Sequence, residues 1–339
     1  MSTPQQLTLT IVGPITIAVT TAVIACVAFT KRFHKGLFYM QVFLAISEMI
    51  CGIDWAIGVA SDTTACMAIG IWHEFFLNAT VCWTVLISVH CYFTVMKGAM
   101  IADSYWLYYH AYGWGCPLLL TAIGLVVQKA TETPIYGSAG NYCWVQDKNM
   151  RVFIFYIELW LHLIVILVLY TLLFRRVVEI MNKVSNVSGS TGDSTNNSSK
   201  NETKRGQDSF KSPSTNIEST TGASKGALNV PSNKGVSSSI VKSSKQQPST
   251  MSNSRVKAIV FRAVLIAGGF IVIWTPPTAG RLMQFFNITV PQWLSIYMTL
   301  SFSMMGIWNS FVFFLTSYWA EIMVFFGFKQ KGAQADERV

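Results

Sequence analysis

Residues 152–174 read VFIFYIELWLHLIVILVLYTLLF, and this apolar run ends at Arg175 and Arg176. A helix needs about 20 mainly apolar residues to cross the hydrocarbon core of a bilayer, so the run is long enough. Within it stand one acid, Glu158, and one histidine, His162. The stretch therefore predicts a membrane-spanning helix.

Six further runs share this character, at residues 9–29, 39–60, 67–95, 108–128, 258–280 and 293–318. Charged residues form 12% of the 339-residue chain, about half of the ~25% found in soluble domains. The ten-residue alternation typical of a membrane β-barrel is not seen. The sequence therefore predicts an all-α fold, a bundle of seven transmembrane helices.

Basic residues predict the orientation of this bundle. If the N-terminus lies outside, only Lys129, Lys148, Arg151 and Arg281 of the 25 Lys and Arg residues fall on the outer side. Cytoplasmic loops carry the excess of Lys and Arg, so we expect an outer N-terminus and a cytoplasmic C-terminus. The net charge of +9 then reflects topology and attraction to the lipid bilayer, not to nucleic acid. No cleavable signal sequence is recognisable, so the first helix is expected to act as a signal anchor.

This topology divides the chain into five parts. They are a short extracellular N-terminus (1–8), five helices (9–174), a long cytoplasmic loop (175–255), two helices (256–318) and a cytoplasmic tail (319–339) that could form a short amphipathic helix. The loop is dense in Ser, Thr and Asn, and its ends are basic. We expect its middle to be disordered and open to kinases, and its ends to continue the membrane helices.

Two of the seven cysteines, Cys66 and Cys143, fall outside the hydrocarbon and on the outer, oxidising side. Disulfides persist in such compartments. A bridge between them would hold the 129–150 loop over the mouth of the bundle, and two free thiols are the alternative.

Ionisable residues at membrane depth are costly and usually face the bundle interior. The outer half is predicted to hold a ligand-binding set of Asp54, His73, Glu74, Glu158, His162 and Arg281, with Trp144 of the outer loop at its entrance. Three acids against one arginine predict a net acidic cavity. The alternative for each side chain is a hydrogen bond or salt bridge between helices, such as Arg281 with Glu74 or Glu158.

A second set of residues suits a conformational switch. Pro276 and Pro277 remove amide donors in the 258–280 run, so a kink is expected there, with Trp274 as a bulky neighbour. This is the one strong break expected in the seven helices. Glu48 is the deepest acid, and Asn309 is expected to donate an interhelical hydrogen bond.

Several motifs resemble the cyclic-AMP-receptor-like G-protein-coupled receptors of slime moulds and fungi. They are CMAIGIW (66–72), NYCWV (141–145), WTPPTAGRL (274–282) and GIWNSFVFF (306–314). The resemblance covers roughly residues 10–180 and 255–320. The 67–95 run ends in SVHCYFTVMKG without the Asp-Arg-Tyr triplet of rhodopsin-like receptors, which argues against that class.

The resemblance implies a plasma-membrane receptor that senses an extracellular small ligand and activates a heterotrimeric G protein through movement of the sixth helix. Basic residues beside the cytoplasmic ends of the helices would then dock the G protein, although snorkelling to lipid explains them equally. They are Lys97, Arg175, Arg176, Arg255, Lys257 and Arg262.

Two other classes compete with the receptor. A transporter or channel should show internal repeats and paired broken helices, and the sequence shows no repeat. A membrane hydrolase with bound zinc should place several histidines at one depth, but His73, His162 and His90 fall at outer, middle and inner levels. We therefore predict no catalytic residue, no cofactor and no metal site.

Overall fold

The computed structural model describes residues 3–31, 36–190 and 253–318, with the bundle as one compact unit. Its elements follow one another along the chain as α1 (Pro4–Phe29), α2 (Gly36–Ile57), α3 (Thr63–Lys97), α4 (Ala99–Ser104), α5 (Trp106–Thr131), β1 (Tyr136–Ser138), β2 (Cys143–Val145), α6 (Lys148–Arg151), the π-helical turn η2 (Val152–Tyr156), α7 (Ile157–Ser190), α8 (Asn253–Phe285), α9 (Gln292–Ser303) and α10 (Met305–Ser317).

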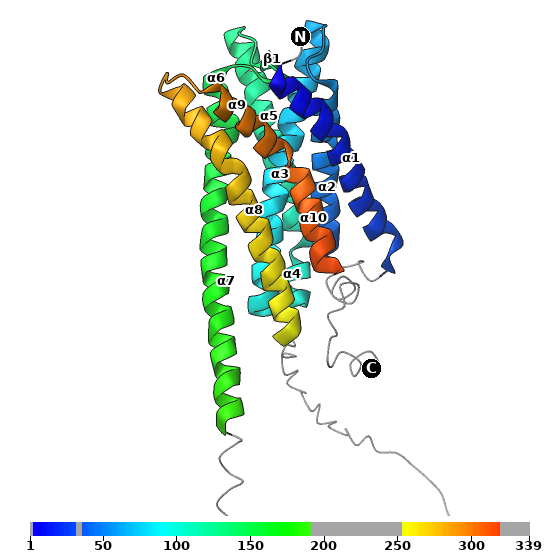
Figure 1. Ribbon diagram of the computed structural model, residues 1–339, viewed down its shortest axis with the longest axis vertical. Helices are drawn as coiled ribbons and strands as arrows, with labels where there is room; N and C mark the ends of the chain where they lie inside the picture. The colour runs from blue at the N-terminus through cyan, green and yellow to red at the C-terminus, as the bar shows by residue number, and fades with distance from the viewer. Residues whose placement is uncertain (1–2, 32–35, 191–252, 319–339) are drawn as a thin grey trace, which may run out of the picture. The chain divides into compact units, whose positions relative to one another are not determined.

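The long helices of the bundle run alongside one another (Figure 1). Five helical segments among the described residues are each long and apolar enough to cross a membrane, and the bent pair α9 and α10 makes a sixth. The remaining apolar run, 258–280, lies within α8. All seven apolar runs are thus helical, and the predicted all-α bundle is confirmed.

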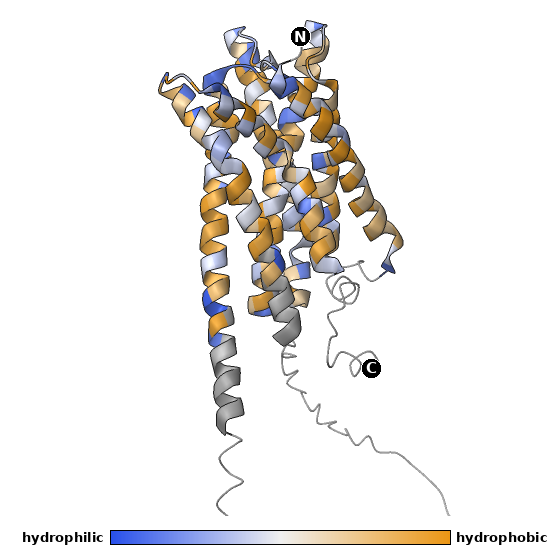
Figure 2. Ribbon diagram, viewed as in Figure 1, coloured by the Kyte–Doolittle hydropathy of each residue, from blue (hydrophilic) through white to orange (hydrophobic). Residues whose placement is uncertain are grey.

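Apolar side chains cover the outside of this bundle. Leu118, Leu119 and Val126 of α5 are exposed, as are Leu161 and Val168 of α7. Figure 2 shows the same apolar character along the outer helices. Apolar surface of this extent suits lipid rather than water, in keeping with a multi-pass membrane protein.

Helix α3 lies at the centre of the bundle. In its most apolar window 72% of the residues are buried, against 22–44% for the other four single helices. It contacts α2, α5, α8 and both strands. Functional side chains on α3 therefore face several partners at once.

Small residues bring neighbouring helices close together. A side chain at Gly13 of α1 would lie 2.7 Å from the carbonyl oxygen of Gly52 in α2. A side chain at Gly306 of α10 would lie 2.6 Å from Thr16 of α1. Close approach through glycine is a common way to pack membrane helices.

The breaks in the last two spans differ from those expected. Residues 293–318 form two helices, α9 and α10, which meet at Met304 with a bend of 43°. Helix α8, by contrast, continues through Pro276 and Pro277. Ser301 of α9 donates a hydrogen bond of 2.6 Å to the Ile273 carbonyl, which has lost its helical partner at Pro277. The expectation that only the 258–280 run is strongly broken was therefore wrong, because the last span bends at Met304.

A small hairpin closes one end of the bundle. Strands β1 and β2 pair antiparallel, with Gly137 opposite Trp144. Gly140 sits at the turn with φ of 108°, a conformation that favours glycine. The Thr3 hydroxyl, just before α1, donates to the Asn141 amide oxygen at 2.9 Å, so the start of the chain meets the hairpin at this end. Helix α4 lies at the opposite end (Figure 1).

The basic continuations of the membrane helices are confirmed on both sides of the long loop, because α7 runs to Ser190 and α8 starts at Asn253. Residues 191–252 of the predicted cytoplasmic loop lie outside the described residues, and so does the predicted tail, 319–339.

Candidate functional site

A disulfide joins Cys66 of α3 to Cys143 of β2, with 5.2 Å between their Cα atoms. The predicted bridge is confirmed. One turn along α3, a side chain at Gly70 would lie 3.0 Å from the Trp144 carbonyl oxygen. The hairpin therefore lies directly on α3. The disulfide holds it there, and Gly70, which has no side chain, lets the two backbones approach closely.

Trp144 anchors the hairpin to α3 and α6. Its indole nitrogen donates to Glu74 Oε2 at 2.5 Å, and Asn78 donates to the other carboxylate oxygen at 2.9 Å. The Arg151 guanidinium lies 5.0 Å from the centre of the Trp144 ring, a cation–π contact. Arg151 also donates to the Val145 carbonyl. A buried carboxylate and a buried cation thus hold one aromatic ring between them.

A cavity of about 140 Å³ lies beside this hairpin. Five parts of the bundle meet around it. Its wall is formed by Leu77 of α3, Ala139, Asn141, Tyr142 and Trp144 of the hairpin, Tyr156 of η2, Trp274, Pro277, Arg281 and Gln284 of α8, and Ser295, Met298, Thr299 and Phe302 of α9. The cavity therefore joins the hairpin to the helix that carries the two prolines.

The charge of this cavity differs from the expected one. Among the described residues that form the wall, Arg281 is the only charged one and none carries a carboxylate. Within the described residues, Arg281 donates to neutral groups, to Gln284 Oε1 at 2.6 Å and to the Tyr156 hydroxyl at 3.4 Å. The expected net acidic character is absent from this wall, because the acids are engaged elsewhere.

Two aromatic residues add donors to the wall. Burial raises the pKa of Tyr142 to about 12, so its hydroxyl keeps its proton at physiological pH. The Trp274 indole nitrogen is buried without a hydrogen-bond partner among the described residues. An unpaired buried donor is costly, so a ligand acceptor at this wall would be stabilised.

The predicted ligand-binding residues fall into separate groups. Trp144 and Arg281 line the cavity. Glu74 accepts from the Trp144 indole nitrogen, and Asp54 Oδ2 lies 3.1 Å from His73 Nδ1, within hydrogen-bonding distance. Glu158 and His162 share a face of α7, 3.5 Å apart, as their spacing predicts. These five are not among the lining residues, and no salt bridge joins Arg281 to Glu74 or Glu158 in the described structure.

The residues predicted to form a switch lie on α2, α8 and α10. Asn309 of α10 donates to Glu48 of α2 at 2.5 Å, the interhelical bond expected of Asn309. Trp274 packs on Phe155 and Phe270, with ring centres 5.3 and 6.2 Å away. Pro276 lies inside α8 one residue before Pro277, whose ring lines the cavity.

The predicted docking residues differ in their exposure. Lys97 and Arg175 are exposed, and Arg176 pairs with Glu179 of its own helix at 2.8 Å. Arg255 and Lys257 lie in α8, and their side chains fall outside the described structure.

Arg262, in contrast, is only 5% exposed. It donates to the Thr316 and Ser317 hydroxyls of α10 at 2.6 and 2.7 Å and lies over the Phe38 ring. In this conformation Arg262 ties α8 to α10 and presents no docking surface.

Three features of the site were missed by sequence reasoning. Arg151 was counted as an outer charge, and its position before an apolar run does not reveal its contacts with Trp144 and Val145. Gln284 and Thr299 were not singled out, because polar residues near helix ends are common. The π-helical turn η2, which sets the register of Tyr156 and Glu158, has no signal in the sequence.

Comparison with known proteins identifies the family of the chain. Residues 15–205, more than half of the chain, match the model of the family described as 7 transmembrane receptor (Secretin family).

Individual relatives agree with this match. G-protein coupled receptor 1 of Arabidopsis thaliana is 28% identical over 142 residues, which cover 41% of this chain and 42% of the relative. Cyclic AMP receptor-like protein A of Dictyostelium discoideum is 25% identical over 110 residues, or 32% of this chain and 28% of the relative. Adhesion G-protein coupled receptor D1 of Bos taurus is 25% identical over 142 residues, or 41% and 15%. The chain spans less than half the length of each of these relatives.

Proposed function

The chain belongs to the secretin family of seven-transmembrane receptors, and on this premise we propose that it senses an extracellular small ligand and activates a heterotrimeric G protein. The observation that carries the proposal is the cavity shared by the disulfide-bound hairpin and α8. A ligand in this cavity would touch the fixed wall at Trp144 and the proline-bearing helix at Trp274 and Pro277. It could therefore favour one position of α8 over another.

The wall suggests the chemical class of the ligand. Arg281 offers an unbalanced positive charge, while Tyr142, Trp144 and Trp274 offer flat apolar surface. We infer a small ligand with an anionic group and a planar ring, the anion paired with Arg281. A charged hydrogen bond of this kind contributes about 1.5–3 kcal/mol.

Hydrogen bonds to the last span set the free energy that a movement of α8 requires. The Arg262 bonds to α10 and the Ser301 bond to Ile273 both tie α8 to the last span. Interhelical hydrogen bonds in membranes average about 0.6 kcal/mol, with a maximum of about 1.7. Three bonds of average strength amount to about 1.8 kcal/mol. A hundredfold preference of the ligand for the moved state supplies about 2.8 kcal/mol, which is enough to offset them.

We also infer membership of the cyclic-AMP-receptor-like branch, with an outer N-terminus and a plasma-membrane location. The motifs NYCWV and WTPPTAGRL support this branch, and so does the likeness to the Dictyostelium protein. On this topology the cavity opens outside, and Lys97, Arg175, Arg176, Arg255 and Lys257 lie on the cytoplasmic side to dock the G protein. The long loop, 175–255, would be the part open to kinases.

A ligand screen in cells tests the proposal. Cells that express the chain are exposed to small aromatic anions, and cyclic AMP and calcium are recorded beside uptake of each labelled compound. We expect one compound to change cyclic AMP or calcium without entering the cell faster. Uptake that depends on the chain, with no change in either messenger, would favour a transporter instead.

A further inference from the structure

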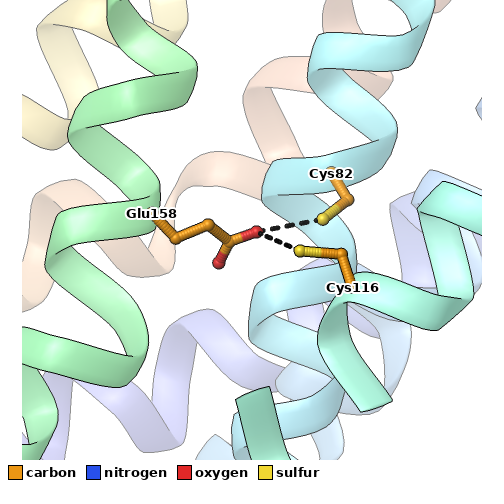
Figure 3. Close-up of side chains that lie close together, drawn as sticks. All are labelled: Cys82, Cys116 and Glu158. Carbon is orange, nitrogen blue, oxygen red and sulfur yellow. Dashed lines mark hydrogen bonds between the residues drawn. The ribbon is translucent and has the colours of Figure 1, made fainter. Parts of the chain in front are cut away.

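A second polar cluster lies inside the bundle, between three helices. It consists of Cys82 of α3, Cys116 of α5 and Glu158 of α7, whose ligand atoms all lie within 4.8 Å of one another. Both thiols point at the same carboxylate oxygen, Glu158 Oε1, at 3.1 Å from Cys82 Sγ and 3.5 Å from Cys116 Sγ (Figure 3). None of the three residues lines the cavity beside the hairpin.

A histidine stands next to this cluster. His162 lies one helical turn after Glu158, and its Nδ1 atom is 3.5 Å from Glu158 Oε1. Its other ring nitrogen, Nε2, is 2.5 Å from the Tyr112 hydroxyl oxygen. When Nε2 donates its proton to Tyr112, Nδ1 keeps a free lone pair on the side of the cluster. Metal-bound histidines are commonly held in this way by an oxygen on the second nitrogen.

Two polar atoms of this group are buried without partners. Glu158 Oε2 and His162 Nδ1 make no hydrogen bond within the described part of the chain. Both residues are more than nine-tenths buried. A buried polar atom without a partner costs about 1–3 kcal/mol. The cluster thus holds more electron-pair donors than protons to satisfy them.

We propose that Cys82, Cys116, Glu158 and His162 bind a divalent cation of the zinc class. Two sulfurs, one oxygen and one nitrogen form the mixed set that zinc takes in a tetrahedral site. Softer thiolate donors exclude calcium and magnesium, which prefer oxygen. Binding releases the two thiol protons to solvent, and the two positive charges of the cation offset the two thiolates, so the Glu158 carboxylate remains as the one uncompensated charge of the site.

Such a cation would fasten α3, α5 and α7 together below the hairpin. Zinc ligands lie about 2.0–2.3 Å from the metal, so Cys82, Cys116 and Glu158 need only a small movement inward from their spacing of at most 4.8 Å. His162 would join them from the side of Glu158, 3.5 Å from its carboxylate oxygen. Cys116 is half-buried, so it is the least enclosed of the three residues. The site involves neither the cavity wall nor α8, so metal binding can be measured whether or not the chain couples to a G protein.

Cobalt provides a direct test on the purified full-length chain. Co²⁺ bound to thiolates gives an absorption band that Co²⁺ bound to oxygen or nitrogen alone does not. We expect this band in the wild type, its removal by Zn²⁺, and a loss of affinity of at least about tenfold in Cys82→Ser, Cys116→Ser and Glu158→Gln. Cys91→Ser, which changes another buried thiol of α3, should keep the band.

Alkylation of the wild type keeps the test valid if the variants fail to fold. Zn²⁺ should slow the alkylation of Cys116 but not that of Cys26, a half-buried thiol on α1. The proposal is wrong if the wild type shows no thiolate band, if Zn²⁺ leaves Cys116 as reactive as before, or if Cys82 and Cys116 are isolated as a disulfide.

Discussion

At the scale of single residues, Trp144 connects most of the site. Trp144 directly follows the disulfide cysteine Cys143, and its indole nitrogen donates to Glu74. Its ring makes a cation–π contact with Arg151 and lines the cavity. These contacts come from α3 and α6, and they fix one orientation of the ring. The sequence placed Trp144 at the entrance, but its partners could not be predicted because they depend on how the hairpin folds over α3.

The disulfide predicts equal effects at its two ends. Cys66→Ser and Cys143→Ser should each lower thermal stability, by about 2–5 kcal/mol at the scale typical of native disulfides. The double variant should be no worse than either single one, because one bond is lost in all three. Surface expression and thermal unfolding in detergent measure this.

A Cys51→Ser variant is the control for the disulfide, because it removes a buried free thiol. A sharp difference between the two single variants would contradict a bridge between Cys66 and Cys143 in the mature protein.

Arg281 carries the charge that we assign to ligand recognition. Arg281→Gln should raise the concentration of ligand needed for a half-maximal response by about 10- to 100-fold, because a charged hydrogen bond is lost. Lys129→Gln makes the same change of charge at an exposed position of α5 outside the cavity wall. Equal loss in both variants would show that only the general charge of the outer face matters.

At the scale of elements, three side chains tie α8 to the last span. Trp308 donates to the Leu265 carbonyl at 3.2 Å, Ser301 to the Ile273 carbonyl, and Arg262 to two hydroxyls of α10. The prolines were visible in the sequence. The bond from Ser301 and the bend at Met304 were not, because both depend on how α9 packs against α8.

Arg262 gives a prediction with a definite sign. If its bonds to Thr316 and Ser317 hold α8 in place, Arg262→Ala should raise basal nucleotide exchange several-fold. If Arg262 instead docks the G protein, the same change should lower ligand-driven exchange and leave basal exchange low.

Arg176→Ala is the reference for a loss of docking, since Arg176 is a proposed docking residue that pairs with Glu179 within its own helix. It should lower ligand-driven exchange and leave basal exchange low. Basal exchange on the purified G protein distinguishes the two roles of Arg262.

At the scale of the whole molecule, composition and periodicity were enough for the fold. Seven apolar runs predicted seven helical spans, and the two outer cysteines predicted the bridge. The sequence predicted a net acidic cavity, but the three acids lie outside its wall. Their hydrogen-bond partners come from other parts of the bundle, which a sequence does not reveal: His73 for Asp54, Trp144 for Glu74 and Cys82 for Glu158. Local patterns fix helices, while the polar contacts between them depend on the assembled bundle.

Nucleotide exchange on a purified G-protein α subunit, with and without the chain in membranes, tests the central claim most directly. We predict that membranes with the chain accelerate exchange when the ligand found in the screen is added, and that Arg281→Gln shifts this response to higher ligand concentration. Exchange that never responds, while the same membranes transport the solute, would contradict the receptor account.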